Sequence, residues 1–176
     1  MSSERLVVAI DTSTDMLACA VARVTDAAGD ERMTIDVLAT GDHMCRRRAN
    51  VELVNTIDAA LADAGRSRDE VDAYLVGRGP GSFTGVRIGI STAKGLARGA
   101  NAPLYGASTL DACAWTAWRA GVRGLLGVAA DAMRGEVYPA LYQLDETGAH
   151  RMFDRERVVK VAVAVEEWAA HPDAAS

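Results

Sequence analysis

The sequence predicts an α/β protein built from two lobes. Short apolar or alternating segments, which are typical of β-strands, are interleaved with segments whose apolar residues recur with the period of an α-helix. One series of strand, strand, strand, helix, strand and helix is complete near residue 105, and a second series of helix and strands follows it. We therefore expect a first lobe over residues 1–105 and a second, incomplete lobe over residues 106–176.

The composition is that of a folded, water-soluble protein. Of the 176 residues, 49% are hydrophobic and 24% are charged, and the formal net charge is −5. This negative balance excludes a protein that binds nucleic acid over its whole surface, so any anion site must be local. No apolar run reaches the roughly 18 residues of a membrane span, and the apolar start at residues 6–10 is too short for a signal peptide. We expect a cytoplasmic protein without a membrane segment.

The three cysteines predict neither a disulfide nor a metal site. Cys19, Cys45 and Cys113 are odd in number and widely separated, and none of them forms a C-x-x-C pair. Such thiols are typical of a reducing compartment. Cys19 shares an alternating strand face with Leu17 and Val21, so we interpret it as part of the core.

The first lobe begins with three strands and an amphipathic helix. Strands are predicted over residues 6–10, 17–24 and 33–40, and the turns between them indicate antiparallel pairing. A helix is predicted over residues 49–64, because apolar residues recur at helical spacing until Gly65. Its apolar surface is wider than one neighbour needs, which indicates that the helix contacts more than the sheet.

The remaining elements follow the same alternation. A strand at residues 73–77 leads into a glycine-rich loop and a second helix, and a short strand follows at residues 102–106. The second lobe then begins with a helix over residues 108–121, for which Ser108 and Asp111 form a capping-box pattern. The other predicted elements of this lobe are strands over residues 125–131 and 136–144 and a helical segment over residues 155–170.

The segment GRGPGSFTGVRIG leaves two functions open for the turn before the second helix. The spacing of Gly79, Gly81 and Gly85 fits neither the Walker A pattern nor the dinucleotide-binding pattern. A glycine-rich turn at a helix N-terminus can still hold an anion on its backbone amides, with Ser82 or Thr84 as the helix cap. The alternative is a tight turn that lets parts of the protein pack closely.

The helix after this turn carries two contrasting stripes. Gly85, Gly89 and Ala93 recur every fourth residue, although an interior glycine costs a helix about 1 kcal/mol relative to alanine. We therefore favour close packing of this side against another backbone. The opposite stripe is basic and contains no acidic residue, so it is either a solvated or a binding surface; it consists of Arg87, Ser91, Lys94 and Arg98.

Four segments together resemble a known family. They are AIDTST near the N-terminus, GRGPGSFTGVRIGISTAKGLA, PLYGASTLDA and DAMRGEVY, and they extend over the chain to about Tyr142. They are similar to the TsaB (YeaZ) branch of the glycoprotease-like family, within the actin/sugar-kinase/Hsp70 superfamily. The resemblance implies two actin-like ATPase (ribonuclease H-like) lobes, and because family members usually run longer, it implies that the second lobe lacks its final part.

The resemblance also implies a function and partners. Members of this branch are non-catalytic subunits that bind the enzyme TsaD, and with TsaE they complete N6-threonylcarbamoyladenosine on the adenosine next to the anticodon of tRNA. They bind TsaD through helices of the first lobe and can form homodimers through the same surface. We therefore expect TsaD and TsaE as protein partners, tRNA as a ligand of the complex, and no cofactor.

The expected partner surface is the helix over residues 49–64 with the basic cluster that precedes it. The helix has a broad apolar face, and three arginines lie before its N-terminus, where positive charge opposes the helix dipole. Such a cluster fits an acidic protein surface or a phosphate backbone, and equally a solvated loop. The residues that we expect at the interface are Arg46, Arg47, Arg48, Val51, Val54, Ile57, Asp58 and Leu61.

An ATPase or small-molecule kinase is the main enzymatic alternative. Asp11 and Asp131 each end a predicted strand, where carboxylates could orient a metal ion beside a nucleotide. However, Ser13 stands where a phosphate-binding turn needs glycine, and an Asx turn explains Asp11 more simply. The candidate contacts for an anion or nucleotide are Asp11, Gly81, Ser82, Thr84, Arg87 and Asp131.

A metallopeptidase is a weaker alternative. The resemblance implies that TsaD holds its metal through an H-x-x-x-H pair, which corresponds to Ser108 and Ala112 here, and neither side chain binds a metal as imidazole does. The three histidines of the chain, His43, His150 and His171, are scattered. We expect no metal site and no catalytic residue, and we favour a scaffold subunit.

Overall fold

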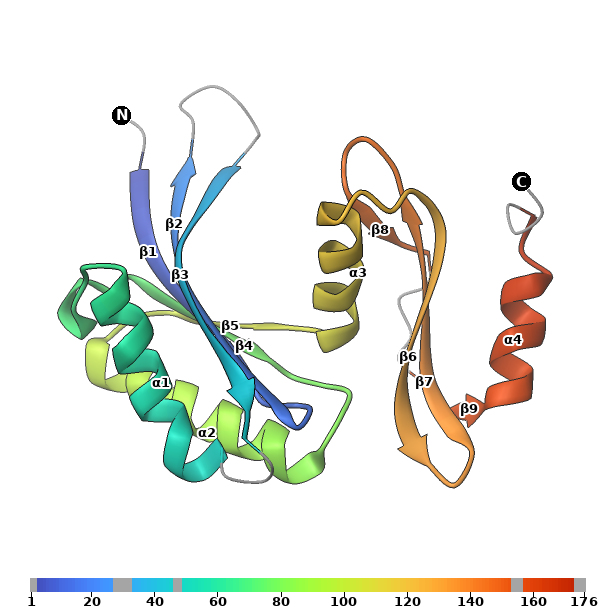
Figure 1. Cartoon of the computed structure of the whole chain (residues 1–176), viewed down its shortest axis with the longest axis horizontal. Coiled ribbons are helices and arrows are strands. Elements are labelled where there is room, and N and C mark those ends of the chain that lie inside the picture. Colours follow the sequence, from blue (N-terminus) through green and yellow to red (C-terminus); the bar gives the residue numbers. More distant parts are fainter. Residues whose placement is uncertain (1–2, 27–32, 46–48, 153–156, 173–176) are drawn as a thin grey trace. The chain divides into compact units, whose positions relative to one another are not determined.

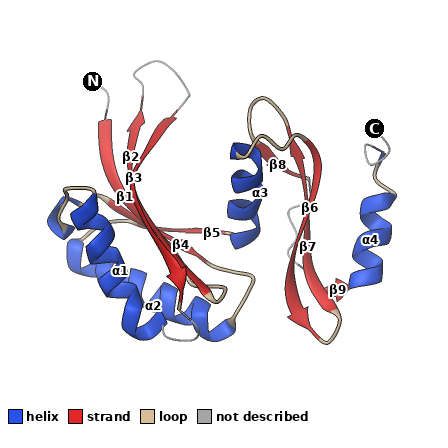
Figure 2. Ribbon diagram, in the orientation of Figure 1, coloured by secondary structure: helices blue, strands red, loops and turns tan. Residues whose placement is uncertain are grey.

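The computed structural model describes residues 3–26, 33–45, 49–152 and 157–172 (Figure 1, Figure 2). Their elements follow the predicted α/β order, with two further short strands at Ala149–Arg151 and Val159–Lys160. They form two compact units, divided between Ala107 and Ser108. The predicted division lies two residues earlier, but Gly106 and Ala107 pair with Val76 and Gly77 in the first sheet. Among the described helices, none is long and apolar enough to cross a membrane.

The first unit contains a five-stranded sheet, formed by β1 (Ser3–Asp11), β2 (Met16–Asp26), β3 (Met33–Met44), β4 (Ala73–Gly77) and β5 (Leu104–Ala107). The strand order is β3-β2-β1-β4-β5. As predicted, the first three strands are antiparallel, whereas β4 joins β1 in parallel and β5 joins β4 in parallel. The first three strands are longer than the apolar segments that predict them.

Two helices, α1 (Ala49–Asp63) and α2 (Phe83–Ala100), cover one face of this sheet (Figure 1). α1 packs on β2 and β3, whereas α2 packs on β1, β4 and β5, and the two helices also contact each other. Alternate residues of the strands face the helices, because successive side chains of a strand point to opposite faces. The core between the layers buries Val8, Leu17, Val21, Leu53 and Ile57.

α1 ends near Gly65, as predicted. Gly65 has a φ of 66°, a left-handed conformation that costs glycine little because it has no Cβ. Its amide donates to the Ala62 carbonyl (2.9 Å), and the Arg66 amide donates to the Leu61 carbonyl (2.8 Å). These bonds satisfy carbonyls at the end of the helix. A short 3₁₀ helix, η1 (Arg68–Glu70), then leads the chain into β4.

The second unit contains an antiparallel sheet, formed by β6 (Gly124–Met133), β7 (Glu136–Leu144), β8 (Ala149–Arg151) and β9 (Val159–Lys160). The order is β6-β7-β8, and β9 pairs with β7. Its helices are α3 (Thr109–Arg119), which packs on β6, β7 and β8, and α4 (Val161–Ala169), which packs on β7 and β9. The helix predicted within residues 155–170 is therefore shorter, because residues 159–160 pair as a strand.

The start of α3 differs in one respect from its predicted capping box. Ser108 is the N-cap residue, as predicted, but its side chain makes no cap hydrogen bond. The Asp111 carboxylate instead accepts hydrogen bonds from the Tyr142 hydroxyl (2.6 Å) and the Arg151 guanidinium (3.1 Å), which joins α3 to β7 and β8. Burial, followed by the bond to Asp111, raises the pKa of Tyr142 above its ordinary value.

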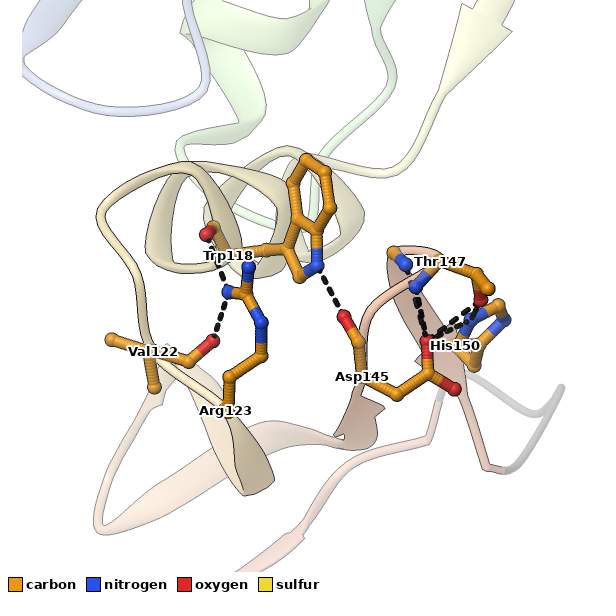
Figure 3. A network of polar contacts seen from close by, with 7 residues as sticks. Trp118, Val122, Arg123, Asp145, Thr147 and His150 are labelled. Atoms are coloured by element: carbon orange, nitrogen blue, oxygen red, sulfur yellow. Dashed lines mark hydrogen bonds and ion pairs between the residues drawn. The ribbon is translucent and has the colours of Figure 1, made fainter. Parts of the chain in front are cut away.

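The turn between β7 and β8 is held by one carboxylate (Figure 3). Asp145 accepts hydrogen bonds from the Thr147 amide (2.7 Å) and hydroxyl (2.6 Å) and from the Gly148 amide (3.2 Å). The Thr147 hydroxyl, followed by the Thr147 amide, lowers the pKa of Asp145 to about 2. The Asp145 carbonyl accepts the indole N–H of Trp118 (2.6 Å), and the Arg123 guanidinium lies over that ring. The turn is thus fixed to α3.

Candidate functional site

The glycine stripe of α2 packs on the turn between β1 and β2. Thr12 and Ser13 of this turn are buried. A Cβ at Gly85 would overlap the Thr12 carbonyl oxygen, and a Cβ at Gly89 would overlap the Thr12 hydroxyl. That hydroxyl donates a hydrogen bond to the Gly85 carbonyl (2.7 Å). The predicted close packing of this stripe is confirmed, and the backbone that it meets belongs to the same lobe.

The glycine-rich loop before α2 also binds this turn. The Ser82 amide donates to the Ser13 carbonyl (2.6 Å), and a Cβ at Gly81 would overlap the same oxygen. Gly79 has a φ of 85°, which favours glycine. Ser82 caps α2, as predicted, by accepting a hydrogen bond from the Gly85 amide (3.3 Å). Of the two functions that the sequence leaves open, these contacts favour the packing turn over the anion site.

The two strand-end aspartates each close a turn of their own. The Asp11 carboxylate accepts a hydrogen bond from the Ser13 amide (2.7 Å) and lies against Gly77, where a Cβ would overlap it. The Asp131 carboxylate accepts a hydrogen bond from the Met133 amide (2.8 Å). The Asx turn at Asp11 is therefore confirmed. The two carboxylates belong to different units, and each is held by an amide of its own turn.

The remaining metal-ligating side chains are dispersed. Within the described parts of the chain, no group of three or more histidine, cysteine or acidic side chains is placed to hold a metal ion. His43 pairs with Glu52 (2.9 Å), and His150 pairs with Asp145 (3.2 Å). Cys19 is buried as predicted, and burial raises the pKa of its thiol to about 11, so it is a protonated core residue.

α1 divides the predicted interface residues between two faces. Ile57 and Leu61 are 1% and 2% exposed, respectively, and lie in the core with Leu53. The prediction that they contact a partner is therefore corrected: their helical spacing from Leu53 directs them to the sheet. Val51 and Val54 are 59% and 38% exposed and stay available. The apolar surface that α1 offers to a partner is narrower than predicted.

Of the four charged residues in the predicted interface, the structure describes only Asp58. Asp58 is exposed, and its carboxylate accepts two hydrogen bonds from the Arg68 guanidinium (2.5 and 2.6 Å). Its charge is thus paired within the first lobe. The basic cluster of Arg46, Arg47 and Arg48 lies outside the described residues, so its contact with a partner stays a prediction.

α2 carries a second pair of glycines that nothing in the described structure explains. At Gly95 and Gly99 no atom lies within 4 Å of the position of a Cβ. An alanine at each site would therefore fit, and at Gly95, which lies in the helix interior, it would stabilise α2 by about 1 kcal/mol. Both glycines are exposed, like the two valines of α1. We refer to these exposed residues as the outer face of the helix pair: Val51, Val54, Gly95 and Gly99.

The predicted anion contacts of the first unit are divided between two places. Thr84 and Arg87 line a shallow cavity of about 380 Å³ between α1 and α2. Asp11 lies at the turn between β1 and β2, which we call the clamped turn because the glycine-rich loop with Gly81 and Ser82 binds it. Asp131 belongs to the second unit. The other residues that line the cavity are Asn50, Ile88, Ser91 and Thr92.

Comparisons with known proteins agree on one group of relatives. The family model described as TsaD, tRNA N6-adenosine threonylcarbamoyltransferase, matches residues 43–170. The tRNA threonylcarbamoyladenosine biosynthesis protein TsaB of Escherichia coli K12 is 39% identical over 91% of this chain and 64% of the relative. The Haemophilus influenzae protein of the same name is 41% identical over 74% of this chain and 50% of the relative.

A solved structure decides the family. YeaZ from Pseudomonas aeruginosa matches with a TM-score of 0.72 and 30% identity, over 88% of this chain and 67% of that one. This chain belongs to the TsaB (YeaZ) family. The α/β fold expected from the sequence is thereby confirmed. This TsaB-family chain spans 64% and 50% of the two curated relatives.

In this TsaB-family chain, three residues that shape the site were not identified from the sequence: Thr12, Gly95 and Gly99. Thr12 was not singled out, although it contacts both Gly85 and Gly89; its position in the AIDTST segment was the available signal. Gly95 and Gly99 were also missed. An interior glycine that costs helix stability was the signal there, but only coordinates separate a glycine in contact from an exposed one.

Proposed function

We propose that this chain is a non-catalytic subunit that binds a TsaD threonylcarbamoyltransferase through the outer face of α1 and α2. In this proposal the complex, with TsaE as a third protein, forms N6-threonylcarbamoyladenosine in tRNA. The names of the curated TsaB relatives and the description of the matching family model support this pathway.

The outer face is the observation that carries the proposal. Val51 and Val54 expose apolar side chains on a helix whose opposite side already fills the core. Gly95 and Gly99 leave the surface of α2 bare, which permits close approach of a second helix. Because α1 and α2 contact each other, exposed apolar side chains on one and a bare stripe on the other together fit a protein-protein interface.

The clamped turn supports a subunit without its own nucleotide chemistry. In the first lobe the Thr12 hydroxyl and the Ser13 carbonyl are bonded to α2 and its preceding loop. Asp11 is engaged by the Ser13 amide and packs against Gly77. A phosphate at this turn would have to displace those contacts. We therefore place the function of this lobe on its helices and away from the strand ends.

The same outer face would serve a homodimer. Two copies that met through α1 and α2 would bury the surface that TsaD is proposed to cover, so the two assemblies would compete. We expect TsaD to convert any homodimer into a heterodimer, and light scattering of the mixture measures this directly. A chain that stayed dimeric while bound to TsaD would place one of the two contacts elsewhere.

The proposed interface is tested by one pair of matched arginine substitutions on α1. Val54→Arg places a charge on the outer face, and Ala59→Arg places the same charge on the flank of α1 that lines a groove with β3. We expect Val54→Arg to abolish co-purification with TsaD and to stop threonylcarbamoylation of tRNA in a mixture with TsaD and TsaE. Ala59→Arg should retain both.

Two results would contradict the proposal. If Val54→Arg bound TsaD as well as Ala59→Arg did, the interface would lie elsewhere on the chain. If the chain alone, without TsaD, hydrolysed ATP with Mg²⁺ at an enzymatic rate, the non-catalytic assignment would be wrong. Circular dichroism of both variants is the control, because each substituted side chain is exposed and both proteins should keep their helices.

A further inference from the structure

The cavity between α1 and α2 is lined by five polar side chains and by Ile88. Asn50 lies in the first turn of α1, and Thr84 lies in the first turn of α2. Arg87, Ser91 and Thr92 complete the polar lining. Among the described residues, none of these five side chains makes a hydrogen bond or ion pair with another protein group.

Arg87 supplies the charge of this cavity. Its guanidinium lies over the ring of Phe83, 5.4 Å from the centroid, and this contact holds the side chain while leaving its N–H groups free to donate. A guanidinium offers two parallel donors that match the two oxygens of a carboxylate. The hydroxyls of Thr84, Ser91 and Thr92 and the amide of Asn50 add further donors, so the cavity is complementary to an oxyanion.

Helix electrostatics favour the same ligand. The first turns of α1 and α2 both contribute to the lining, and the N-terminal turn of a helix carries partial positive charge. The first turn of α2 contains no acidic residue that would neutralise it. A negative group in the cavity would therefore meet Arg87 and the favourable N-terminal turn of α2, whereas the first turn of α1 contains the acidic Glu52.

The surroundings distinguish a protein carboxylate from a nucleic-acid backbone. The exposed part of α1 carries the carboxylate of Asp63, and the net charge of the chain is −5, so a continuous chain of phosphates would be repelled. One acidic side chain in an apolar surface would avoid this repulsion. The cavity lies between the two helices that carry the outer face, so an acidic residue on a docked helix can reach it.

We infer that the Asn50–Arg87–Thr92 cavity binds the carboxylate of one acidic side chain on the partner protein. This inference rests on the proposed function, because it assigns a chemical anchor to the TsaD contact. The apolar outer face supplies the buried area, and the carboxylate fixes how the partner helix lies along α1 and α2.

Four variants with TsaD as the probe test this anchor. Arg87→Gln removes the charge, and we expect it to weaken TsaD binding by about tenfold or more. Arg87→Lys keeps the charge without the two parallel donors and should give an intermediate loss. Thr92→Val removes one hydroxyl at nearly constant shape and should give a smaller loss. The control is Arg98→Gln, an exposed cation of α2 outside the cavity, which should bind nearly as wild type does.

The outcomes separate this inference from the proposed function. If Arg87→Gln binds TsaD like wild type, the carboxylate anchor is overturned while the proposed function stands. Equal losses in Arg87→Gln and Arg98→Gln also overturn it, because they indicate general charge attraction. If Arg87→Gln weakens binding of isolated tRNA and leaves TsaD binding unchanged, the occupant is a nucleic-acid phosphate. If the wild-type chain does not bind TsaD at all, the proposed function itself fails.

Discussion

The two faces of the helix pair use the same residue types in opposite ways. On the inner face, Ile57 and Leu61 fill the core, and Gly85 admits the backbone of Thr12. On the outer face, Val51 and Val54 are exposed. Gly95 and Gly99 have open space around them, although each costs α2 about as much helix stability as a glycine of the inner face.

Packing within the chain explains the glycines of the inner face, but it does not explain those of the outer face. A glycine is needed on the inner face because an atom of the same chain occupies the place of its Cβ. Close packing within the lobe therefore offsets its cost in helix stability. An outer glycine has no such atom in the described structure. We therefore propose that the outer face meets a partner protein, and the following substitutions test that distinction.

The largest expected effect comes from truncating the inner face of α1. Leu61→Ala removes a side chain that is fully buried in the core and leaves a cavity, so we expect a loss of about 3 kcal/mol in the free energy of unfolding. Urea denaturation followed by circular dichroism measures the loss. A loss below about 1 kcal/mol would mean that Leu61 is more accessible than the structure has it, and that its assignment to the interface should return.

A methyl group on the inner face of α2 should also destabilise the lobe. Gly85→Ala places a Cβ against the Thr12 carbonyl oxygen, and we expect a net loss of about 2 kcal/mol after the gain in helix propensity. The same denaturation experiment measures it. Stability equal to that of wild type would show that the turn between β1 and β2 moves away easily, and that it is not clamped.

The same substitution on the outer face should have the opposite sign. Gly95→Ala meets open space, so we expect the free energy of unfolding of the isolated chain to rise by about 1 kcal/mol. We expect its affinity for TsaD to fall, because the methyl group keeps a partner helix at a distance. A variant that was more stable and bound TsaD normally would remove Gly95 from the interface.

The smallest effect on stability is expected at the exposed valine of α1. Val51→Ser changes a side chain that is 59% exposed, and the free energy of unfolding should stay within about 0.5 kcal/mol of wild type. Titration calorimetry with TsaD should nevertheless show weaker binding. Lost stability at this position would mean that Val51 packs within the chain.

Much of the first lobe could be predicted from the sequence because its signals are local. The alternation of Leu17, Cys19 and Val21 predicts the buried face of β2, and Gly65 predicts the end of α1. The tail was harder: residues 159–160 pair with β7, and a pairing between distant strands leaves no local pattern. Asp111 was likewise interpreted as a cap, whereas tertiary partners on β7 and β8 engage it.

The site was less predictable, because the spacing of apolar residues on a broadly apolar helix does not show which of them face the sheet. Val54, Ile57 and Leu61 fit one helical stripe, yet Leu53 and not Val54 completes the buried face. Arg87 was named both as part of the basic stripe of α2 and as an anion contact with Asp11 and Gly81, whereas it lines the cavity toward α1. In both cases the sequence did not show which side of the helix faces the sheet.

Hydrogen-deuterium exchange of the chain, with and without TsaD, tests the central claim most directly. We predict that TsaD slows amide exchange along residues 51–58 of α1 and 88–99 of α2, and leaves the turn between β1 and β2 unchanged because that turn is already protected in the free chain. Protection at the β1–β2 turn or in the second unit, with none on the two helices, would contradict the account.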